Sequence, residues 1–186
     1  ITAGQRWASG GVIAAYEYAR NTELLSDDRS FTDSRPGISL YPGFRRHAIA
    51  LSGHQALNER LELAVDGIYN KRWSFSRNPD NPAGDLNVSR YEYHTTSRSI
   101  AVAPGLSLEI GDSWKLSLSG VYGEETVNLN RYRYAGTVRT GIVEVCYCNN
   151  GRSIDLWADG NVFALPGGRG KLALGTGYRD ILFVVC

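Results

Sequence analysis

Residues 155–179 read DLWADGNVFALPGGRGKLALGTGYR. On both sides of the central Leu-Pro-Gly-Gly sequence, apolar side chains occupy every second position and polar or small ones fill the gaps. The apolar positions are Ile154, Leu156, Ala158 and Val162 before the centre, and Leu172, Leu174 and Tyr178 after it. A period of two predicts strands with one apolar face. Because Pro166 lacks a backbone N–H and the glycines after it can adopt positive φ, the stretch predicts a β-hairpin that turns at 165–170.

The same plan recurs upstream of this hairpin. Further alternating runs cover residues 11–18, 46–54, 61–70, 106–110 and 114–122, with polar turns at 57–60 and 111–113. Three hairpins therefore share one pattern, with one apolar and one polar face each. This pattern predicts an all-β fold, an antiparallel hairpin meander.

The composition excludes several classes of protein. The chain has 186 residues, and its 20 basic and 19 acidic side chains give a net charge of +1. This balance leaves no electrostatic footprint for nucleic acid. No run reaches the roughly 18 apolar residues that a membrane-spanning helix needs. The length fits a single domain over residues 1–186.

The connections between the alternating runs differ in length. The turns within hairpins are tight, whereas polar segments at about 20–44, 73–92 and 124–150 are long. Short turns on one side and long loops on the other are typical of outer-membrane β-barrels. Aromatic girdles would fit the long-loop ends at Tyr16, Tyr18, Tyr69, Trp73 and Tyr122, and the short-turn end at Trp114. We therefore expect a segment of a transmembrane β-barrel, with a small closed barrel or a sandwich as the alternative if the chain folds alone.

Four pieces of the sequence follow one another in a recognisable order. They are GGVIAAYEYARNTELLSDDRSF at 10–31, FRRHAIALSGHQALNERLELAVDGIYNKR at 44–72, LSLEIGDSWKLSLSGVYGEE at 106–125, and the stretch at 155–179. In this order they resemble the first third or so of the barrel of TonB-dependent outer-membrane receptors, directly after the plug domain. The loops near 76–92 and 126–150 and the tail DILFVVC lie outside the resemblance.

The resemblance implies a plugged barrel of about 22 strands in the bacterial outer membrane. Such a receptor takes up a scarce nutrient, a siderophore or carbohydrate-type ligand, and its implied partners are membrane lipid and that small molecule. The chain would lack the plug, so TonB would act only through missing parts of the receptor. Seven or eight strands cannot close at that size, so we expect a fragment whose two open edges allow self-association. No cofactor and no catalytic step are implied.

Arginine and tyrosine concentrate in two short motifs, RYEYH and RYRYAG. The candidate ligand-binding residues are Arg90, Tyr91, Tyr93, Arg131, Tyr132, Arg133 and Tyr134. Together these side chains suit a carboxylate, sugar or siderophore-like ligand. The alternative is that the tyrosines belong to an aromatic girdle and that the arginines face lipid phosphate or solvent.

Catalytic and metal-binding groupings are weak in this sequence. Ser52, His54 and Asp66 share a strand face and have the composition of a hydrolytic triad, but no G-x-S-x-G turn accompanies them. The loop at 78–85 offers Asp80, Asn81 and Asp85 as oxygen ligands for calcium without the regular twelve-residue pattern. A solvated, proline-broken loop is the simpler interpretation.

Three cysteines complete the inventory of reactive groups. Cys146 and Cys148 are too close in sequence for an unstrained disulfide, so one of them, with Cys148 as the candidate, is expected to pair with Cys186 in an oxidising compartment.

A second hypothesis stays open beside the receptor: the chain could fold alone as a small soluble β protein with ligand-binding or hydrolase activity.

Overall fold

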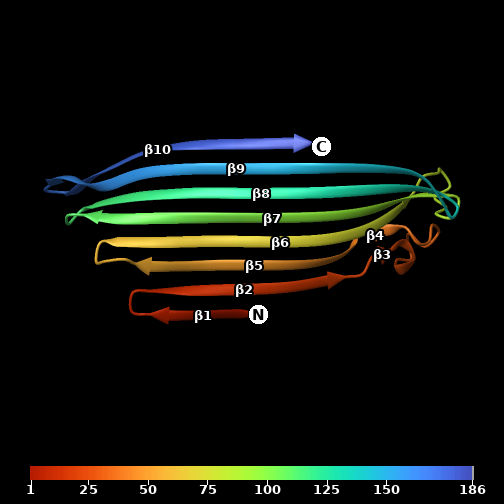
Figure 1. Cartoon of the computed structure of the whole chain (residues 1–186), viewed down its shortest axis with the longest axis horizontal. Helices are drawn as coiled ribbons and strands as arrows, with labels where there is room; N and C mark the ends of the chain where they lie inside the picture. Colours follow the sequence, from red (N-terminus) through yellow and green to blue (C-terminus); the bar gives the residue numbers. More distant parts are fainter. Residues whose placement is uncertain (186) are drawn as a thin grey trace.

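The computed structural model describes residues 1–185, apart from the side chain of Leu165. One antiparallel sheet contains eight strands in the order β1-β2-β5-β6-β7-β8-β9-β10 (Figure 1). Its strands are β1 Thr2–Trp7, β2 Gly10–Asn21, β5 Gly43–Ala56, β6 Leu61–Pro79, β7 Ser89–Ile110, β8 Trp114–Ala135, β9 Val138–Leu165 and β10 Gly168–Val185. Between β2 and β5 lie a two-stranded sheet of β3 Leu24–Leu25 and β4 Ser39–Tyr41, and the 3₁₀ turn η1 Ser26–Asp28. No helix among the described residues is long and apolar enough to cross a membrane.

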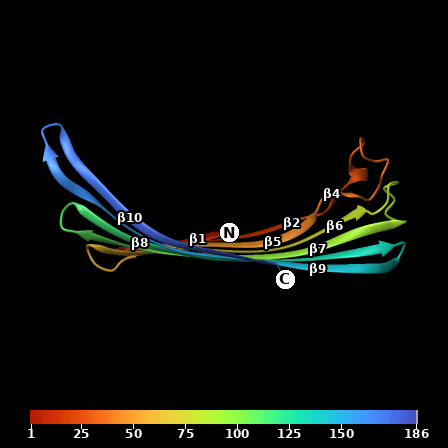
Figure 2. The same cartoon turned by 90° about the horizontal axis from the view of Figure 1, so that it is seen from above.

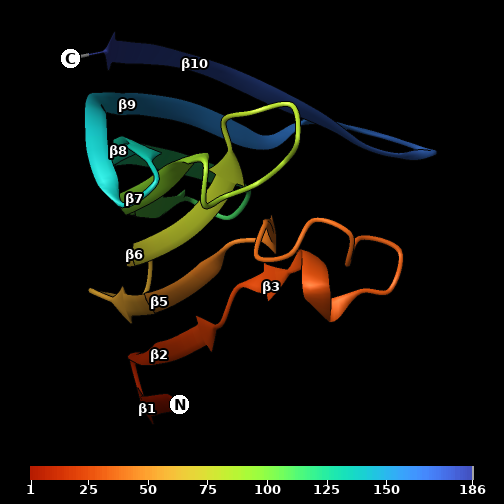
Figure 3. The ribbon, with the colours of Figure 1, turned by 90° about the vertical axis from the view of Figure 1, so that its right-hand side faces the viewer.

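The main sheet is a meander that does not close. Every neighbouring pair of strands is antiparallel, which confirms the predicted all-β hairpin meander. The strands form a curved single layer (Figure 2), and seen end-on they trace an arc with β1 and β10 at its two ends (Figure 3). Within residues 1–185, β1 pairs only with β2 and β10 only with β9. The chain on its own therefore forms neither a small closed barrel nor a sandwich.

The three predicted hairpins are present with the expected turns. β9 ends at Leu165, which is the cross-strand partner of Gly168, so Pro166 and Gly167 alone connect β9 to β10. Gly168 has a φ of 148°, a value that a side chain would strain. Gly111, in the turn between β7 and β8, has a φ of 62°. Local turn chemistry accounts for both reversals.

The long polar segments are mostly strand rather than loop, which corrects the sequence-based expectation. β6 continues to Pro79, and β7 begins again at Ser89, so the connection covers only residues 80–88. β8 reaches Ala135 and β9 starts at Val138, which leaves a two-residue turn in place of a loop over 124–150. Backbone pairing extends these strands although their side chains no longer show an apolar face. Only the segment between β2 and β5 remains a long connection.

Cross-strand register sorts the side chains onto two faces, because directly opposed residues share a face and neighbours along a strand alternate. The apolar face carries Val12, Tyr16, Ile49, Leu51, Leu63, Tyr69, Val102, Leu108, Leu116, Leu118, Tyr122, Ile154, Leu156, Leu172, Leu174 and Tyr178. The polar face carries Glu17, Arg46, Ser52, Asp66, Ser107, Lys115, Ser117, Asp155, Asp159 and Lys171. The predicted apolar positions thus form one continuous surface across the sheet.

Within residues 1–185, no protein layer lies against this apolar surface. Among the described residues, no hydrophobic side chain is buried, and large apolar side chains such as Leu174 at 61% and Ile154 at 52% are exposed. A soluble protein rarely exposes so extended an apolar surface. The stability of the sheet must therefore come from strand pairing together with whatever covers the apolar face.

Candidate functional site

The apolar face is apolar over only part of each strand. On β8 the apolar band covers residues 114–122, and on β7 it covers residues 100–110, in both cases at the short-turn end. Immediately beyond the band on the same face come Lys71, Arg98, Glu124, Arg152 and Asp180. The band is therefore bounded by a row of charged side chains.

Two ion pairs fix part of this charged row. Arg98 Nη2 lies 3.1 Å from Glu124 Oε1, and Arg152 Nη2 lies 2.9 Å from Asp180 Oδ2. All four side chains are substantially exposed, so each pair contributes little free energy. Their position marks the level at which this face of the sheet changes from apolar to charged side chains.

Beyond the band, the two Arg/Tyr motifs lie directly opposite each other. Residues 90–93 of β7 pair with residues 131–134 of β8 in antiparallel register, with Arg90 opposite Tyr134, Tyr91 opposite Arg133, and Tyr93 opposite Arg131. The structure thus brings together residues that are about 40 positions apart in the sequence. It also divides them between the two faces of the sheet.

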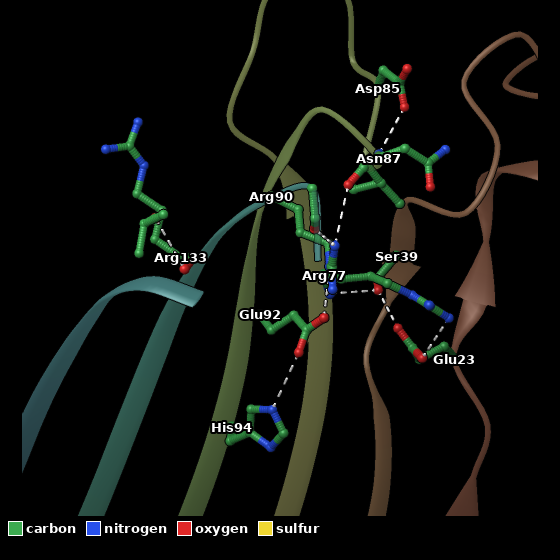
Figure 4. Close-up of polar contacts among 12 residues, drawn as sticks. Glu23, Ser39, Arg77, Asp85, Asn87, Arg90, Glu92, His94 and Arg133 are labelled. Carbon is green, nitrogen blue, oxygen red and sulfur yellow. Dashed lines mark hydrogen bonds and ion pairs between the residues drawn. The ribbon is translucent and has the colours of Figure 1, made fainter. Parts of the chain in front are cut away.

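On the apolar side of this pair of strands, the arginine is used structurally. Arg90 Nε donates to Glu92 Oε1 at 2.7 Å, Arg90 Nη1 donates to the carbonyl of Gly136 at 2.9 Å, and the guanidinium lies 4.5 Å from the Tyr134 ring. Glu92 Oε2 lies 3.9 Å from His94 Nε2 (Figure 4). These contacts clamp the β8–β9 turn to β7 and leave Arg90 little capacity for a ligand.

On the polar side, the two arginines differ. Arg133 Nε donates to Asp80 Oδ2 at 2.6 Å, and this hydrogen bond, reinforced by the charge of Asp80, raises the pKa of Arg133 above its ordinary value. Arg131 has no ion pair within the described residues, and its guanidinium lies 4.9 Å from the Tyr91 ring. Arg131 with Tyr91 and Tyr93 therefore forms the part of the motif that is available for binding.

The loop after β2 is tied to the outer end of β6. Ser39 Oγ hydrogen-bonds to Glu23 and accepts from the backbone N–H of Arg77 at 2.8 Å, and Arg77 Nη2 lies 3.3 Å from Glu23 Oε2 (Figure 4). Glu23 is largely buried, with a side-chain exposure of 15%. This contact holds the long connection against the polar half of the sheet.

The Ser/His/Asp candidates share the polar face as expected, but they do not form a triad. Ser52 is the cross-strand partner of Asp66, and His54 is the partner of Ala64. All three side chains are exposed. No hydrogen bond joins any two of them in the described part of the chain, so nothing orients a nucleophile and a base.

The three candidate calcium ligands accept hydrogen bonds that hold their own loop in place. Asp80 accepts from Arg133, Asn81 Oδ1 accepts from the backbone N–H of Asp85 at 3.0 Å, and Asp85 Oδ1 accepts from that of Asn87 at 2.8 Å. These bonds shape the connection between β6 and β7. Over residues 1–185, no group of three or more His, Cys, Asp or Glu side chains is placed to hold a metal ion.

The cysteines correct the expected pairing. Cys148 is a free thiol and Cys146 is the disulfide-bonded member of the close pair. Both lie on the same face of β9, two residues apart. Cys186, the third cysteine, lies outside the described residues. Sequence reasoning could not choose between Cys146 and Cys148 because spacing alone treats them alike.

A hollow on the polar face contains residues that the sequence did not single out. It has a volume of about 610 Å³ and is lined by Ser99, Glu125, Asn149, Ser153 and Arg179, among others. Asn149 Nδ2 donates to Glu125 Oε2 at 3.2 Å across the β8–β9 pair. Of these residues, Glu125 and Asn149 lie in the segment 124–150 that was expected to be a loop, although the alternation VNLNRYRY at 127–134 could have indicated a continuing strand.

Comparison with known proteins identifies a fold but not a family. No family model matches the sequence, and no curated protein matches it. The sheet is similar to the crystal structure of the ferric citrate transporter FecA in the unliganded form, with a TM-score of 0.56 and 12% sequence identity. The match covers 95% of this chain and 31% of that chain, so this chain spans about a third of the length of the structure it resembles. At this identity the likeness concerns the fold alone: an open antiparallel meander like part of the barrel of a transport protein.

Proposed function

We propose that this chain forms part of the wall of an outer-membrane transport barrel of the TonB-dependent receptor type. The apolar face contacts lipid, and the polar face lines the passage of a small nutrient. One observation carries the proposal: a continuous apolar band crosses the sheet on one face, is bounded by charges, and is covered by no protein core in the described residues. The resemblance to a ferric citrate transporter supports the same assignment.

The height of the band fits a membrane. A tilted transmembrane strand needs about 9–11 residues, and the band covers residues 114–122 of β8. β8 contains 22 residues in total, so its other half projects beyond the lipid. Because strands hydrogen-bond to each other, the backbone of the interior strands needs no water within the membrane.

The soluble alternative lacks the necessary packing. A sandwich requires a second layer over the apolar residues, and the described residues form a single layer with no buried apolar side chain. Light scattering after chromatography, with and without detergent, tests the proposal. We expect the chain to stay in solution only in detergent, whereas a compact monodisperse particle in plain buffer would refute the membrane assignment.

The ligand-binding residues in this proposal are Tyr91, Tyr93 and Arg131 on the polar face. A free guanidinium beside two phenol rings suits a carboxylate-bearing iron chelate or a sugar. Contacts with TonB would be made by other parts of such a receptor.

Equilibrium dialysis of the detergent-solubilised chain, with radiolabelled ferric citrate and separately with a maltooligosaccharide, tests this site. We expect Arg131→Gln to weaken binding of the preferred ligand by roughly tenfold or more, the value typical of a lost charge-assisted hydrogen bond. Arg133→Gln is the matched control, because Asp80 already holds that guanidinium. Equal losses in both variants, or none in either, would reject these residues as the binding site.

A further inference from the structure

On the apolar face, the structure places basic side chains directly opposite one another. Arg20 of β2 is the cross-strand partner of Arg45 of β5, and Lys71 of β6 is the partner of Arg98 of β7. Like charges in directly opposed positions repel each other. With His47, which is the partner of Lys71, these residues form what we call the basic cluster.

Most of the basic cluster lacks the acidic partners that the arginines elsewhere in the charged row have. On β9 and β10, Arg152 is neutralised by Asp180, and at the border of the cluster Arg98 is neutralised by Glu124. Within the described residues, Arg20, Arg45 and Lys71 form no ion pair. The nearby Glu17 lies on the polar face, where it binds Arg46. An anion from outside the chain would therefore complete this row.

Aromatic rings fix the cluster in place. The Trp73 ring lies 4.6 Å from the Arg45 guanidinium and 4.7 Å from Lys71 Nζ. The His47 ring lies 5.0 Å from the Tyr18 ring, and its Nδ1 is 2.8 Å from the Tyr16 hydroxyl. Rings that contact both cations reduce the entropy lost when an anion binds between them.

A hollow lies at the same place. Its volume is about 460 Å³, and its lining includes Arg20, Arg45 and Trp73 together with Tyr18 and Thr96. These five side chains all belong to the apolar face of β2, β5, β6 and β7. Arg20 and Arg45 therefore border a depression with room for a phosphate group and part of the molecule that carries it.

We infer that the basic cluster binds the phosphate head group of an anionic membrane lipid. The inference rests on the proposed function, because the cluster lies two to four residues beyond the apolar band, which ends at Tyr16, Ile49, Tyr69 and Ile100. A lipid whose chains cover this band would place its head group at that level. The position beside the band favours lipid phosphate over a soluble anion.

Native mass spectrometry of the chain in a neutral detergent tests the inference, with phosphatidylglycerol and phosphatidylcholine as probes. We expect phosphatidylglycerol to bind better, and the double variant Arg45→Gln/Lys71→Gln to reduce its binding roughly tenfold or more, since each basic residue near an anionic surface adds to affinity. Arg152→Gln/Lys171→Gln removes the same charge elsewhere and should bind as the unmodified chain does. The exchange Arg45→Lys/Lys71→Arg keeps the charge and should retain most of the binding, which shows that loss in the first variant is not misfolding.

Three outcomes would overturn the inference. They are equal binding of the two lipids, equal losses in both charge-removing variants, and complete displacement of the lipid by an equimolar amount of inorganic phosphate, which would indicate a site for soluble anions. Failure of the proposed function can be distinguished from failure of the lipid site, because the chain would then be monodisperse without detergent and would bind neither lipid. A chain that needs detergent but does not discriminate between the lipids would refute the lipid site alone.

Discussion

At the residue scale, contact with a tryptophan ring explains why position 160 is a glycine. Gly160 of β9 is the cross-strand partner of Trp114 of β8, and a Cβ at Gly160 would collide with the Trp114 ring. The indole ring covers the glycine at the short-turn end of the sheet. Glycine is therefore required at this position for close packing rather than for an unusual backbone conformation.

We expect Gly160→Ala to destabilise the sheet by about 1–3 kcal/mol, the usual cost of overpacking. Gly151→Ala, in the same strand, is the control, because a Cβ there has no atom within 4 Å. It should be neutral or slightly stabilising, since alanine loses less backbone entropy on folding. Urea unfolding in detergent micelles, followed by tryptophan fluorescence, measures both variants. Equal midpoints would contradict the role assigned to Trp114.

The ion pair of Arg133 with Asp80 leads to a prediction about pH. The pKa of Arg133 is raised in the folded chain, so its contribution to stability is complete below the ordinary pKa of an arginine and is lost only as the pH rises through the folded pKa. We therefore expect Arg133→Gln to speed amide hydrogen exchange in residues 80–88, with the same effect at all pH values in the neutral range. If the variant sped exchange only at the highest pH values of that range, another group would control the loop.

At the scale of single strands, β8 consists of two halves whose side-chain patterns differ. The half of β8 at 114–122 alternates apolar with polar side chains, while in the half beyond it Val127 and Leu129 have changed to the polar face. This inversion is physically reasonable, because outside lipid no face is required to be apolar. Within the band, two neighbouring residues therefore lie in opposite environments, one on the apolar face and one on the polar face.

Arginine scanning of β8 in the middle of the band tests this division. Leu118→Arg should make insertion into the membrane less favourable by about 2–4 kcal/mol, because the charge then faces the lipid near the midplane. Ser119→Arg is its neighbour on the polar face, opposite Asp155, and should insert nearly as well as the unmodified chain. Folding into lipid vesicles, measured by urea titration, distinguishes them. Equal costs for the two substitutions would mean that the two faces do not differ in environment.

At the scale of the whole molecule, the open edges determine how the chain associates. β10 contains 18 residues, and within the described chain its outer backbone groups have no partner strand. An edge of this length readily pairs with another strand. In a complete barrel the adjacent strands would satisfy it, and in isolation a second copy of the chain can do so.

We expect the mass of the chain in detergent, measured by light scattering, to increase with protein concentration. The double substitution Gly175→Pro/Thr176→Pro in β10 should suppress this increase, because one of two adjacent N–H groups faces the open edge. The same change in the central strand β6, Gly67→Pro/Ile68→Pro, should unfold the sheet, since edge strands tolerate proline better than central ones. A β10 variant that associates like the unmodified chain would exclude pairing through this edge.

Much of the fold could be predicted because it follows from local rules. The period of two in residues 114–122 and 154–162 assigned side chains to faces, and Pro166 with its glycines located a turn. The extent of the strands was not predictable in this way. Residues 124–135 and 138–150 do not continue the apolar face of the band, and the alternation at 127–134 has the opposite phase, so the pattern of the band does not extend into them. Backbone pairing with neighbouring strands extends them all the same.

The sequence by itself determined the alternation, the tight turns and the apolar band, since each depends on residues a few positions apart. Only the tertiary structure decided that Arg131 stands opposite Tyr93, that Arg20 stands opposite Arg45, and that the eight strands end in an open arc. The physical reason is register. Which residues face each other across two strands depends on hydrogen bonds between distant parts of the chain, and a shift of one residue would exchange the two faces of a strand.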